Sequence, residues 1–232
     1  MSIILAIETS SELASAALLH GNYVIGRESA GVQNHSQSIL PMVQLLFAEA
    51  GITLAQCDAI AFGCGPGSFT GVRTACGIAQ GLAYGLDLPV VPIVTLAAMA
   101  QACREITGAD DVLAILDARM DEVYWAHYRY QDGWRTVVEP TLSAAAAVPF
   151  IAGATACGNG LVAYASLFDA RIFTSEAQNA VVPHAKHVVR LAQQAFDQGA
   201  FAVARDAQPL YLRNKVALTT RERQDKAAQA PA

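Results

Sequence analysis

Two polar turns in the N-terminal half of this sequence have the residue types that bind charged groups. The first follows a predicted strand and consists of Thr9, Ser10 and Ser11. The second precedes a predicted helix, whose dipole favours anions, and is built around Gly65, Gly67 and Ser68. No lysine follows these glycines, so the second turn is not a P-loop. A nucleotide or phosphate site is one interpretation of the two turns, and a strand-to-helix corner that needs positive φ is the other.

Acidic residues near these turns are few. Glu8 ends the first predicted strand, at a position where a carboxylate could bind a metal or activate water. Asp117 and Asp121 flank Arg119 in a predicted hairpin and could form a general acid/base pair. An exposed turn with a local ion pair explains the same three residues without catalysis. The spacing therefore assigns no catalytic residue.

Histidines and cysteines are dispersed along the chain. His184 and His187 are close in sequence, but no carboxylate lies beside them to complete a metal site. The five cysteines contain no CxxC pair, so we expect buried thiols and no disulfide framework. The stretch from Gly65 to Phe69 does not match the GxSxG pattern of serine hydrolases. We predict no metal and no cofactor.

Composition excludes several classes of protein. The chain has 232 residues, of which 53% are hydrophobic and 15% charged, so it is expected to fold, and no apolar run reaches the length that spans a bilayer. The first residues lack a basic region, and we expect a cytoplasmic protein without a signal peptide. Residues 213–232 carry five basic and two acidic groups, whereas the remainder carries ten basic and eighteen acidic groups. This acidic body argues against a free-standing nucleic-acid-binding module.

These residues must be positioned by a mixture of strands and helices. Hydrophobic periodicity in the first part of the chain predicts strands over residues 3–8, 13–20, 23–28, 58–63 and 90–94. It predicts helices over residues 36–50, 69–84 and 95–106, with Ser68 and Thr95 as helix N-caps. In the second helix, Gly77, Gly81 and Gly85 recur every four residues and form a flat stripe.

The strand pattern of the opening returns about one hundred residues later. Leu113-Ala114-Ile115 corresponds to Leu5-Ala6-Ile7, and further strands are predicted over 123–130, 134–138 and 152–157. Helices are predicted over 161–168 and 187–198. The repeat indicates an α/β protein with duplicated βββαβα lobes, the second one reduced. We expect an N-terminal lobe over residues 1–106, a C-terminal lobe over 107–212, and a disordered basic tail over 213–232.

Four motifs resemble the TsaB (YeaZ) family of tRNA threonylcarbamoyladenosine biosynthesis subunits. They begin at Leu5 (LAIETS), Gly65 (GPGSFTGVR), Leu116 (LDARMDEVY) and Pro209 (PLYLR). The resemblance covers about residues 3–213 in order. It implies the actin-like, sugar-kinase-like (ASKHA) fold. It also implies a part in modifying the adenosine beside the anticodon of tRNAs that read codons starting with A.

The same resemblance implies a non-catalytic role. The catalytic relative, TsaD, has a metal-binding HxxxH motif after the strand that corresponds to residues 89–94. The matching positions here are Thr95 and Met99, neither of which binds iron or zinc as imidazole does. The family pattern therefore implies a scaffold or activator subunit, with an enzyme of the same fold, either a metal-dependent peptidase or an ATPase, as the alternative.

The resemblance also implies partners. In the family, the N-lobe helices pair with the equivalent helices of TsaD, and isolated chains pair with themselves. The matching interface residues are expected to be Ile39, Met42, Leu46, Thr70, Arg73, Thr74, Gly77, Ile78 and Gly81. TsaE is expected to join the complex, and tRNA is expected to bind only through it. The small residues of the second helix could instead face their own sheet.

Overall fold

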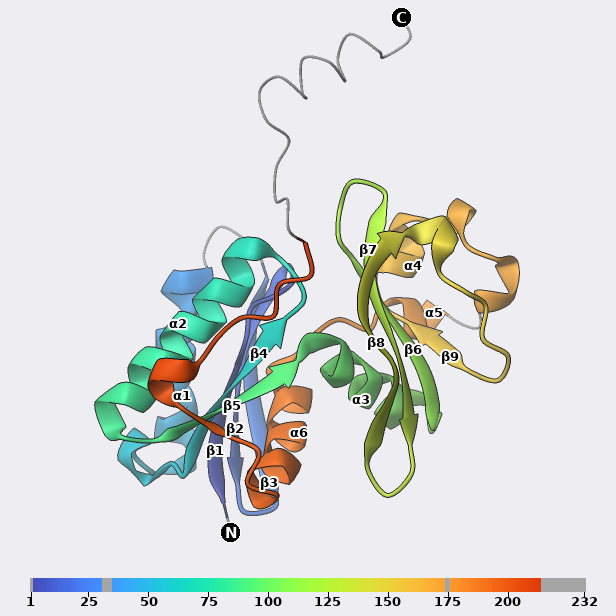
Figure 1. Cartoon of the computed structure of the whole chain (residues 1–232). Helices are drawn as coiled ribbons and strands as arrows, with labels where there is room; N and C mark the ends of the chain where they lie inside the picture. The colour runs from blue at the N-terminus through green and yellow to red at the C-terminus, as the bar shows by residue number, and fades with distance from the viewer. Residues whose placement is uncertain (1, 31–34, 174–175, 214–232) are drawn as a thin grey trace, which may run out of the picture.

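The chain folds into two lobes, each built on its own β-sheet (Figure 1). The computed structural model describes residues 2–30, 35–173 and 176–213. The expected basic tail lies outside the described residues, apart from Arg213. In the described part of the chain, no helix has both the length and the apolarity needed to cross a membrane.

The first lobe contains a six-stranded sheet in the order β10-β5-β4-β1-β2-β3. Its strands are β1 (Ile3–Glu8), β2 (Leu13–His20), β3 (Tyr23–Ala30), β4 (Ala59–Gly65), β5 (Pro89–Val94) and β10 (Ala202–Val203). The predicted antiparallel meander β1-β2-β3 is confirmed, and β1 pairs in parallel with β4. Parallel pairing brings the carboxyl ends of β1 and β4, and so the two polar turns, to the same edge of the sheet.

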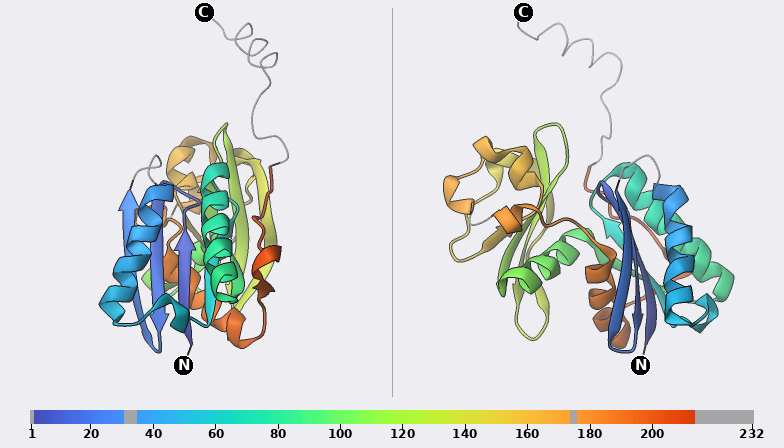
Figure 2. Two further views of the ribbon diagram at one scale, coloured as in Figure 1. Left: turned by 90° about the vertical axis from the view of Figure 1, so that its left-hand side faces the viewer. Right: turned by 180° about the vertical axis from the view of Figure 1, so that it is seen from behind.

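Helices cover both faces of this sheet, so its inner strands β1, β2 and β4 are buried on both sides. Helices α1 (His35–Ala50) and α2 (Phe69–Leu86) pack on one face, where Leu5, Ile7 and Phe62 point. Helices α3 (Thr95–Thr107) and α6 (Ala185–Asp197) pack on the other, against Ile4 and Ala6. Alternate residues of β1 thus enter different cores, as the two-residue period of a strand requires. Figure 2, left, shows α1 and α2 side by side on the outer face.

The second lobe is smaller, as predicted. Its four-stranded sheet has the order β8-β7-β6-β9 and consists of β6 (Asp111–Asp117), β7 (Glu122–Tyr130), β8 (Trp134–Ala144) and β9 (Thr155–Cys157). Helix α3 covers one face, and the short helices α4 (Gly160–Ala163) and α5 (Glu176–Asn179) lie near β9. Because α3 also contacts α6, it lies between the two sheets and belongs to both cores.

The structure differs from the predicted division at residues 106 and 212. After the second sheet, the chain returns to the first lobe, where α6 packs on β1 and β2 and β10 pairs with β5. The 3₁₀ turn that follows, η6 (Ala204–Asp206), lies against α2. Residues 185–207 thus complete the first lobe. A linear division misses this return because a helix pattern does not say which sheet its apolar face covers.

Most element boundaries agree with the prediction to within two or three residues. Ser68 is the N-cap of α2, and its hydroxyl accepts a hydrogen bond from the amide of Gly71 at 3.4 Å. Thr95 is not a cap, because it is already the first residue of α3. The helix predicted over 161–168 is only one turn of α-helix, α4, followed by a 3₁₀ turn. All five cysteines are buried free thiols, as expected.

The burial of one face of α1 contradicts part of the predicted interface. Ile39, Met42 and Leu46 recur at helical spacing and are buried in the core between α1 and the sheet. Side chains that already pack on their own sheet are not available to a partner. Leu40 and Leu45 lie outside this buried face of the same helix and are exposed.

The two faces of α1 should respond differently to a charge. Ile39→Asp places an unpaired carboxylate in the core and should lower the free energy of unfolding by about 3–5 kcal/mol. Leu45→Asp is the matched control because Leu45 is 53% exposed on the same helix, and it should change stability by less than about 1 kcal/mol. Urea unfolding followed by circular dichroism measures both. Equal losses would contradict the assigned orientation of α1.

Candidate functional site

A cavity of about 350 Å³ lies between the two lobes. The first lobe contributes the two polar turns, and the second contributes the β6–β7 hairpin with Asn159. Residues 210–213 of the C-terminal segment close one side. Some of the residues that the sequence marked for chemistry thus line one cavity, although they come from distant parts of the chain: Ser10, Ser11, Gly67, Ser68, Asp117 and Arg119. Others are not among its lining residues: Glu8, Thr9, Gly65, Asp121, His184 and His187.

The two polar turns bind each other directly. The amide of Ser68 donates to the carbonyl of Ser10 at 2.7 Å, and the Thr9 hydroxyl donates to the carbonyl of Gly71 at 2.7 Å. A Cβ atom at Gly71 would lie 1.9 Å from the Thr9 carbonyl oxygen, and one at Gly67 would lie 2.6 Å from the Ser10 Cβ. Since the turns fill the space between them, a phosphate group at that position would require them to separate.

Glu8 lies behind these turns and is completely buried. Its Oε1 accepts a hydrogen bond from the Ser10 amide at 2.6 Å, and the Thr95 hydroxyl lies 3.5 Å from its Oε2. Burial raises the pKa of the Glu8 carboxyl, because desolvation outweighs the hydrogen bonds that favour its charged form. A Cβ at Gly63 would overlap the carboxylate, so this glycine makes room for it. Glu8 therefore serves as an internal hydrogen-bond acceptor at the end of β1.

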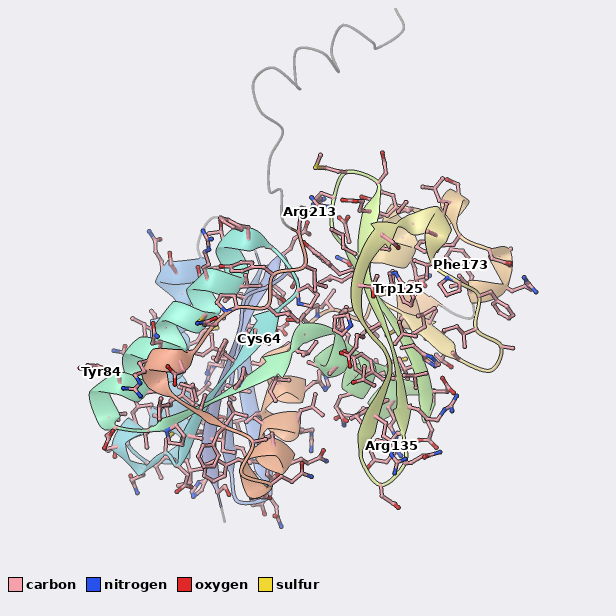
Figure 3. All side chains as sticks on the ribbon, viewed as in Figure 1. Cys64, Tyr84, Trp125, Arg135, Phe173 and Arg213 are labelled. Atoms are coloured by element: carbon pink, nitrogen blue, oxygen red, sulfur yellow. The ribbon has the colours of Figure 1, made fainter. Side chains whose placement is uncertain are left out.

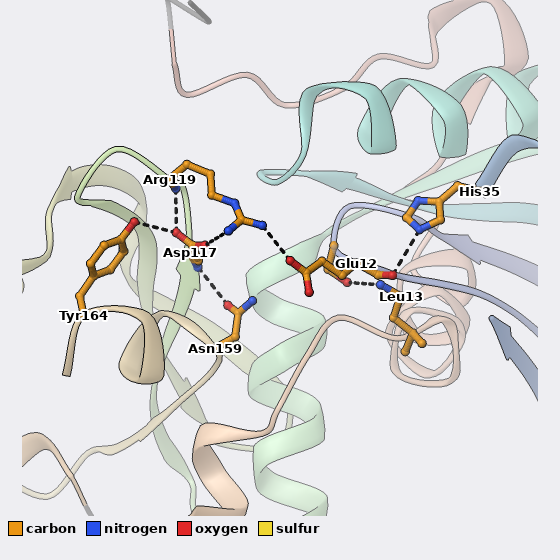
Figure 4. A network of polar contacts seen from close by, with 8 residues as sticks. Glu12, Leu13, His35, Asp117, Arg119, Asn159 and Tyr164 are labelled. Atoms are coloured by element: carbon orange, nitrogen blue, oxygen red, sulfur yellow. Dashed lines mark hydrogen bonds and ion pairs between the residues drawn. The ribbon is translucent and has the colours of Figure 1, made fainter. Parts of the chain in front are cut away.

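On the opposite wall, the side chain of Asp117 is fully engaged (Figure 4). Its Oδ1 accepts from the Arg119 amide at 2.7 Å and from the Tyr164 hydroxyl at 3.0 Å, and its Oδ2 lies 3.3 Å from the Arg119 guanidinium. The Asn159 Oδ1 accepts from the Asp117 amide at 3.0 Å. Asp117 and Arg119 thus form the local ion pair that was the alternative to an acid/base pair.

The positions that correspond to a metal-binding HxxxH are both in the interior. Thr95 faces Glu8, and Met99 is buried in the core that α3 shares with the second sheet. His184 and His187 lie beside separate carboxylates, Glu28 at 2.9 Å and Glu105 at 3.3 Å. Within residues 2–30, 35–173 and 176–213, no three His, Cys, Asp or Glu side chains are grouped to hold a metal ion.

The outer surface of α2 is the second candidate site. Its buried residues include Ala75, Ala79 and Ala83, which face the sheet. Gly77 and Gly81 are exposed, and a Cβ at either would have no neighbour within 4 Å. The glycine stripe thus faces away from its own sheet. Of the other predicted interface residues on α2, Thr70 and Arg73 are exposed, while Thr74 and Ile78 are half-buried.

Exposed apolar side chains lie on both of the outer helices, α1 and α2. Tyr84 is 78% exposed and projects from the far end of α2 (Figure 3). Leu40 and Leu45 are exposed on the neighbouring helix α1. Together with the glycines of α2 they form a surface that we call the outer helical face. Sequence reasoning missed Leu40 and Leu45 because it chose the buried face of α1, and it did not include Tyr84 of α2. The signal was present, since Leu40 and Leu45 interrupt the buried period of Ile39, Met42 and Leu46.

Comparisons with known proteins place this geometry in a family. The chain is 40% identical to the tRNA threonylcarbamoyladenosine biosynthesis protein TsaB of Haemophilus influenzae, over 92% of this chain and 94% of that protein. It belongs to the TsaB family. The TsaB protein of Escherichia coli is 38% identical over 92% of this chain and 96% of its own length. The resemblance seen in the motifs is thereby confirmed.

Structural and family comparisons agree with the TsaB assignment. A family model described as TsaD, tRNA N6-adenosine threonylcarbamoyltransferase, matches residues 27–220. The structure of YeaZ from Pseudomonas aeruginosa has a TM-score of 0.83 and 39% identity, covering 91% of this chain and 100% of that one. Another structure from the same organism, described as an uncharacterized protein with similarity to peptidase YEAZ, has a TM-score of 0.84. The predicted α/β, actin-like fold class is confirmed.

The buried carboxyl of Glu8 predicts a specific pH dependence of stability. Its pKa is raised in the folded protein, so its contribution to stability is full below about pH 4.5 and declines as the pH rises through the folded value. Glu8→Gln keeps the shape and the acceptor for the Ser10 amide but removes the titration. The melting temperature of Glu8→Gln relative to the unmodified chain should therefore rise between pH 4.5 and pH 7.

The matched control is Glu12→Gln, because the Glu12 side chain is 71% exposed. Thermal unfolding at a series of pH values measures both variants. If the difference in melting temperature between Glu8→Gln and the unmodified chain stayed constant with pH, the raised pKa of the buried Glu8 carboxyl would be contradicted.

Proposed function

We propose that this chain is a non-catalytic subunit of the complex that transfers a threonylcarbamoyl group to the adenosine beside the anticodon of tRNAs reading codons that start with A. Its task is to bind TsaD through the outer helical face and hold it in an active state. The observation that carries the proposal is a contrast within one lobe. The positions of a metal-binding motif are buried core residues, while the outer surface of α2 is a glycine stripe that its own fold does not use.

The interior of the cleft supports the non-catalytic part of this proposal. Thr95 and Met99 have no exposed surface, and the Glu8 carboxylate is enclosed by the turns that it stabilises. Asp117 already contacts Arg119 and Tyr164. No carboxylate or hydroxyl of this set is both free and positioned beside a second catalytic group, as general acid/base catalysis requires.

The outer helical face supports the part of the proposal that concerns partner binding. Each exposed glycine within a helix costs about 1 kcal/mol of stability relative to alanine. Gly77 and Gly81 meet nothing within 4 Å, so the isolated fold gains nothing in return. A partner helix can approach such a stripe closely, and exposed Tyr84 on α2 and exposed Leu40 and Leu45 on α1 offer apolar area to it.

The sequence relationship suggests which partner binds there. The TsaD family model matches most of this chain, so TsaD has a helix pair equivalent to α1 and α2. Two related faces pack naturally about a two-fold axis, which gives a heterodimer with TsaD and, for the chain alone, a homodimer. In this proposal TsaE joins the larger complex. The tRNA binds only through the complex, because the body of the chain is acidic.

The alternative is an enzyme of the same fold, either a metal-dependent peptidase or an ATPase. One Pseudomonas aeruginosa relative is described as similar to a peptidase, and that description favours this alternative. The hydrogen bonds between the two polar turns and the buried residues at the HxxxH positions oppose it.

A reconstituted reaction tests the proposed function. Threonylcarbamoylation of tRNA by TsaD, TsaE and the enzyme that makes threonylcarbamoyl-adenylate should fall at least tenfold when this chain is left out. The chain alone should turn over neither ATP nor a peptide substrate. Full-rate modification without the chain would overturn the subunit role. ATP turnover that is lost in Glu8→Ala would support the alternative.

The interface is tested by filling the glycine stripe. Gly77→Leu should retain the fold, and the gain in helix propensity, about 0.8 kcal/mol, should keep the melting temperature from falling. The same leucine blocks close approach of a second helix, so the affinity for TsaD should drop at least about tenfold, which corresponds to 1.4 kcal/mol. Isothermal titration calorimetry measures the affinity of each variant for TsaD. Gln194→Leu, on the exposed side of α6, is the control. Unchanged binding by Gly77→Leu would exclude this face.

A further inference from the structure

The last described residues of the chain contact both lobes. Residues 209–213, which we call the C-terminal strap, follow η6 and pass along α2 toward the β6–β7 hairpin (Figure 1). Four of these residues line the cavity between the lobes. Leu210 packs against the core of the first lobe and Leu212 against the core of the second sheet.

One end of the strap is anchored on the first lobe. The amide of Leu210 donates to the carbonyl of Cys64 at 2.7 Å, next to the polar turn at the end of β4. The Leu210 carbonyl lies so close to Gly65 that a Cβ there would come within 2.9 Å of it. The strap thus lies directly on the backbone of this turn.

Tyr211 adds a second contact to the same lobe. Its hydroxyl accepts a hydrogen bond from the Nε of Arg73 at 2.7 Å. The Arg73 guanidinium also lies 3.5 Å from the ring centroid of Phe69 and 5.4 Å from that of Tyr211. Arg73 and Phe69 belong to the first turns of α2, so Tyr211 attaches the strap to the start of that helix.

The other end is anchored on the second lobe. The Arg213 guanidinium forms an ion pair with Glu122 and lies 3.4 Å from the carbonyl oxygen of Arg119. The Arg213 side chain is 15% exposed, so water screens the pair less than it would at the surface. Figure 3 shows Arg213 at the upper edge of the molecule, between the two lobes.

The hairpin tip that receives Arg213 has an unusual backbone. Arg119, Met120 and Asp121 all have φ near +60°, a conformation that residues other than glycine adopt at a cost of about 1–3 kcal/mol each. Such a tip persists only where its surroundings hold it. Arg213 contacts the tip at the Arg119 carbonyl and the Met120 sulfur.

Another ion pair that joins the lobes here is weak by comparison. Arg119 and Glu12 pair at 2.7 Å, but their side chains are 72% and 71% exposed, so the pair contributes less than about 1 kcal/mol. We propose that residues 209–213 act as an intramolecular clamp, which occupies the mouth of the cleft and fixes the two lobes at one separation. In this role the strap takes the place that a bound ligand has in two-lobed proteins that close around a substrate.

Coupling between the two anchors tests the clamp. Glu122→Ala removes the second-lobe anchor without touching Leu210. In hydrogen–deuterium exchange of the full chain, the Leu210 amide, which bonds to Cys64 in the first lobe, should exchange about tenfold faster in this variant. Arg129→Ala is the control, because Arg129 pairs with Asp111 at the other end of the same sheet. It should leave the Leu210 amide unchanged.

A second variant tests whether a change at the first-lobe anchor affects the second lobe. Tyr211→Phe removes the hydrogen bond to Arg73 and should accelerate exchange of the Glu122 amide, which donates to Arg119 in the hairpin tip. Small-angle scattering of Tyr211→Phe/Glu122→Ala should give a larger radius of gyration than the unmodified chain. Unchanged exchange at the distant anchor in both single variants would overturn the clamp, since the two contacts would then be independent.

Discussion

The close contact between the turn after β1 and the turn after β4 determines most of what the rest of the molecule can do. Two hydrogen bonds of 2.7 Å join the turns, and both depend on the absence of a side chain at Gly67 and Gly71. The contact fixes the first residue of α2, and with it the rotation of the helix about its axis. That rotation directs Ala75, Ala79 and Ala83 to the sheet and Gly77 and Gly81 to the outside.

The same contact changes the chemistry of the cleft. The Ser68 amide and the Thr9 hydroxyl, which could help to surround an anion, are instead hydrogen-bonded within the protein, and the Glu8 carboxylate behind them accepts a hydrogen bond from the Ser10 amide. A metal-binding motif would have its first ligand at Thr95, which faces this buried carboxylate. The TsaD family model matches the chain over residues 27–220, so a shared fold is compatible with an altered centre.

Local patterns in the sequence predicted the elements well but not every direction in which they face. The meander, the N-cap at Ser68 and the reduced second lobe follow from periodicity, turn residues and the internal repeat. The sequence analysis placed Ile39, Met42 and Leu46 in an interface, but these residues of α1 are buried against the sheet. The buried and exposed sides of α1 were hard to tell apart because both carry apolar residues. The return of α6 to the first lobe and the crossing of Tyr211 and Arg213 between the lobes depend on contacts between distant residues, which no local pattern encodes.

The glycines of α2 fall into two groups: one that the fold requires and one that it does not. Gly71 lies against the Thr9 carbonyl, and any side chain there would break the contact between the turns. Gly77 and Gly81, two and three turns further on, touch nothing and weaken the helix by about 1 kcal/mol each. Arg73, which binds the strap through Tyr211, lies between these two groups. One rigid helix therefore connects the cleft, the strap and the outer helical face, so a partner bound to that face would contact the element that also anchors the clamp.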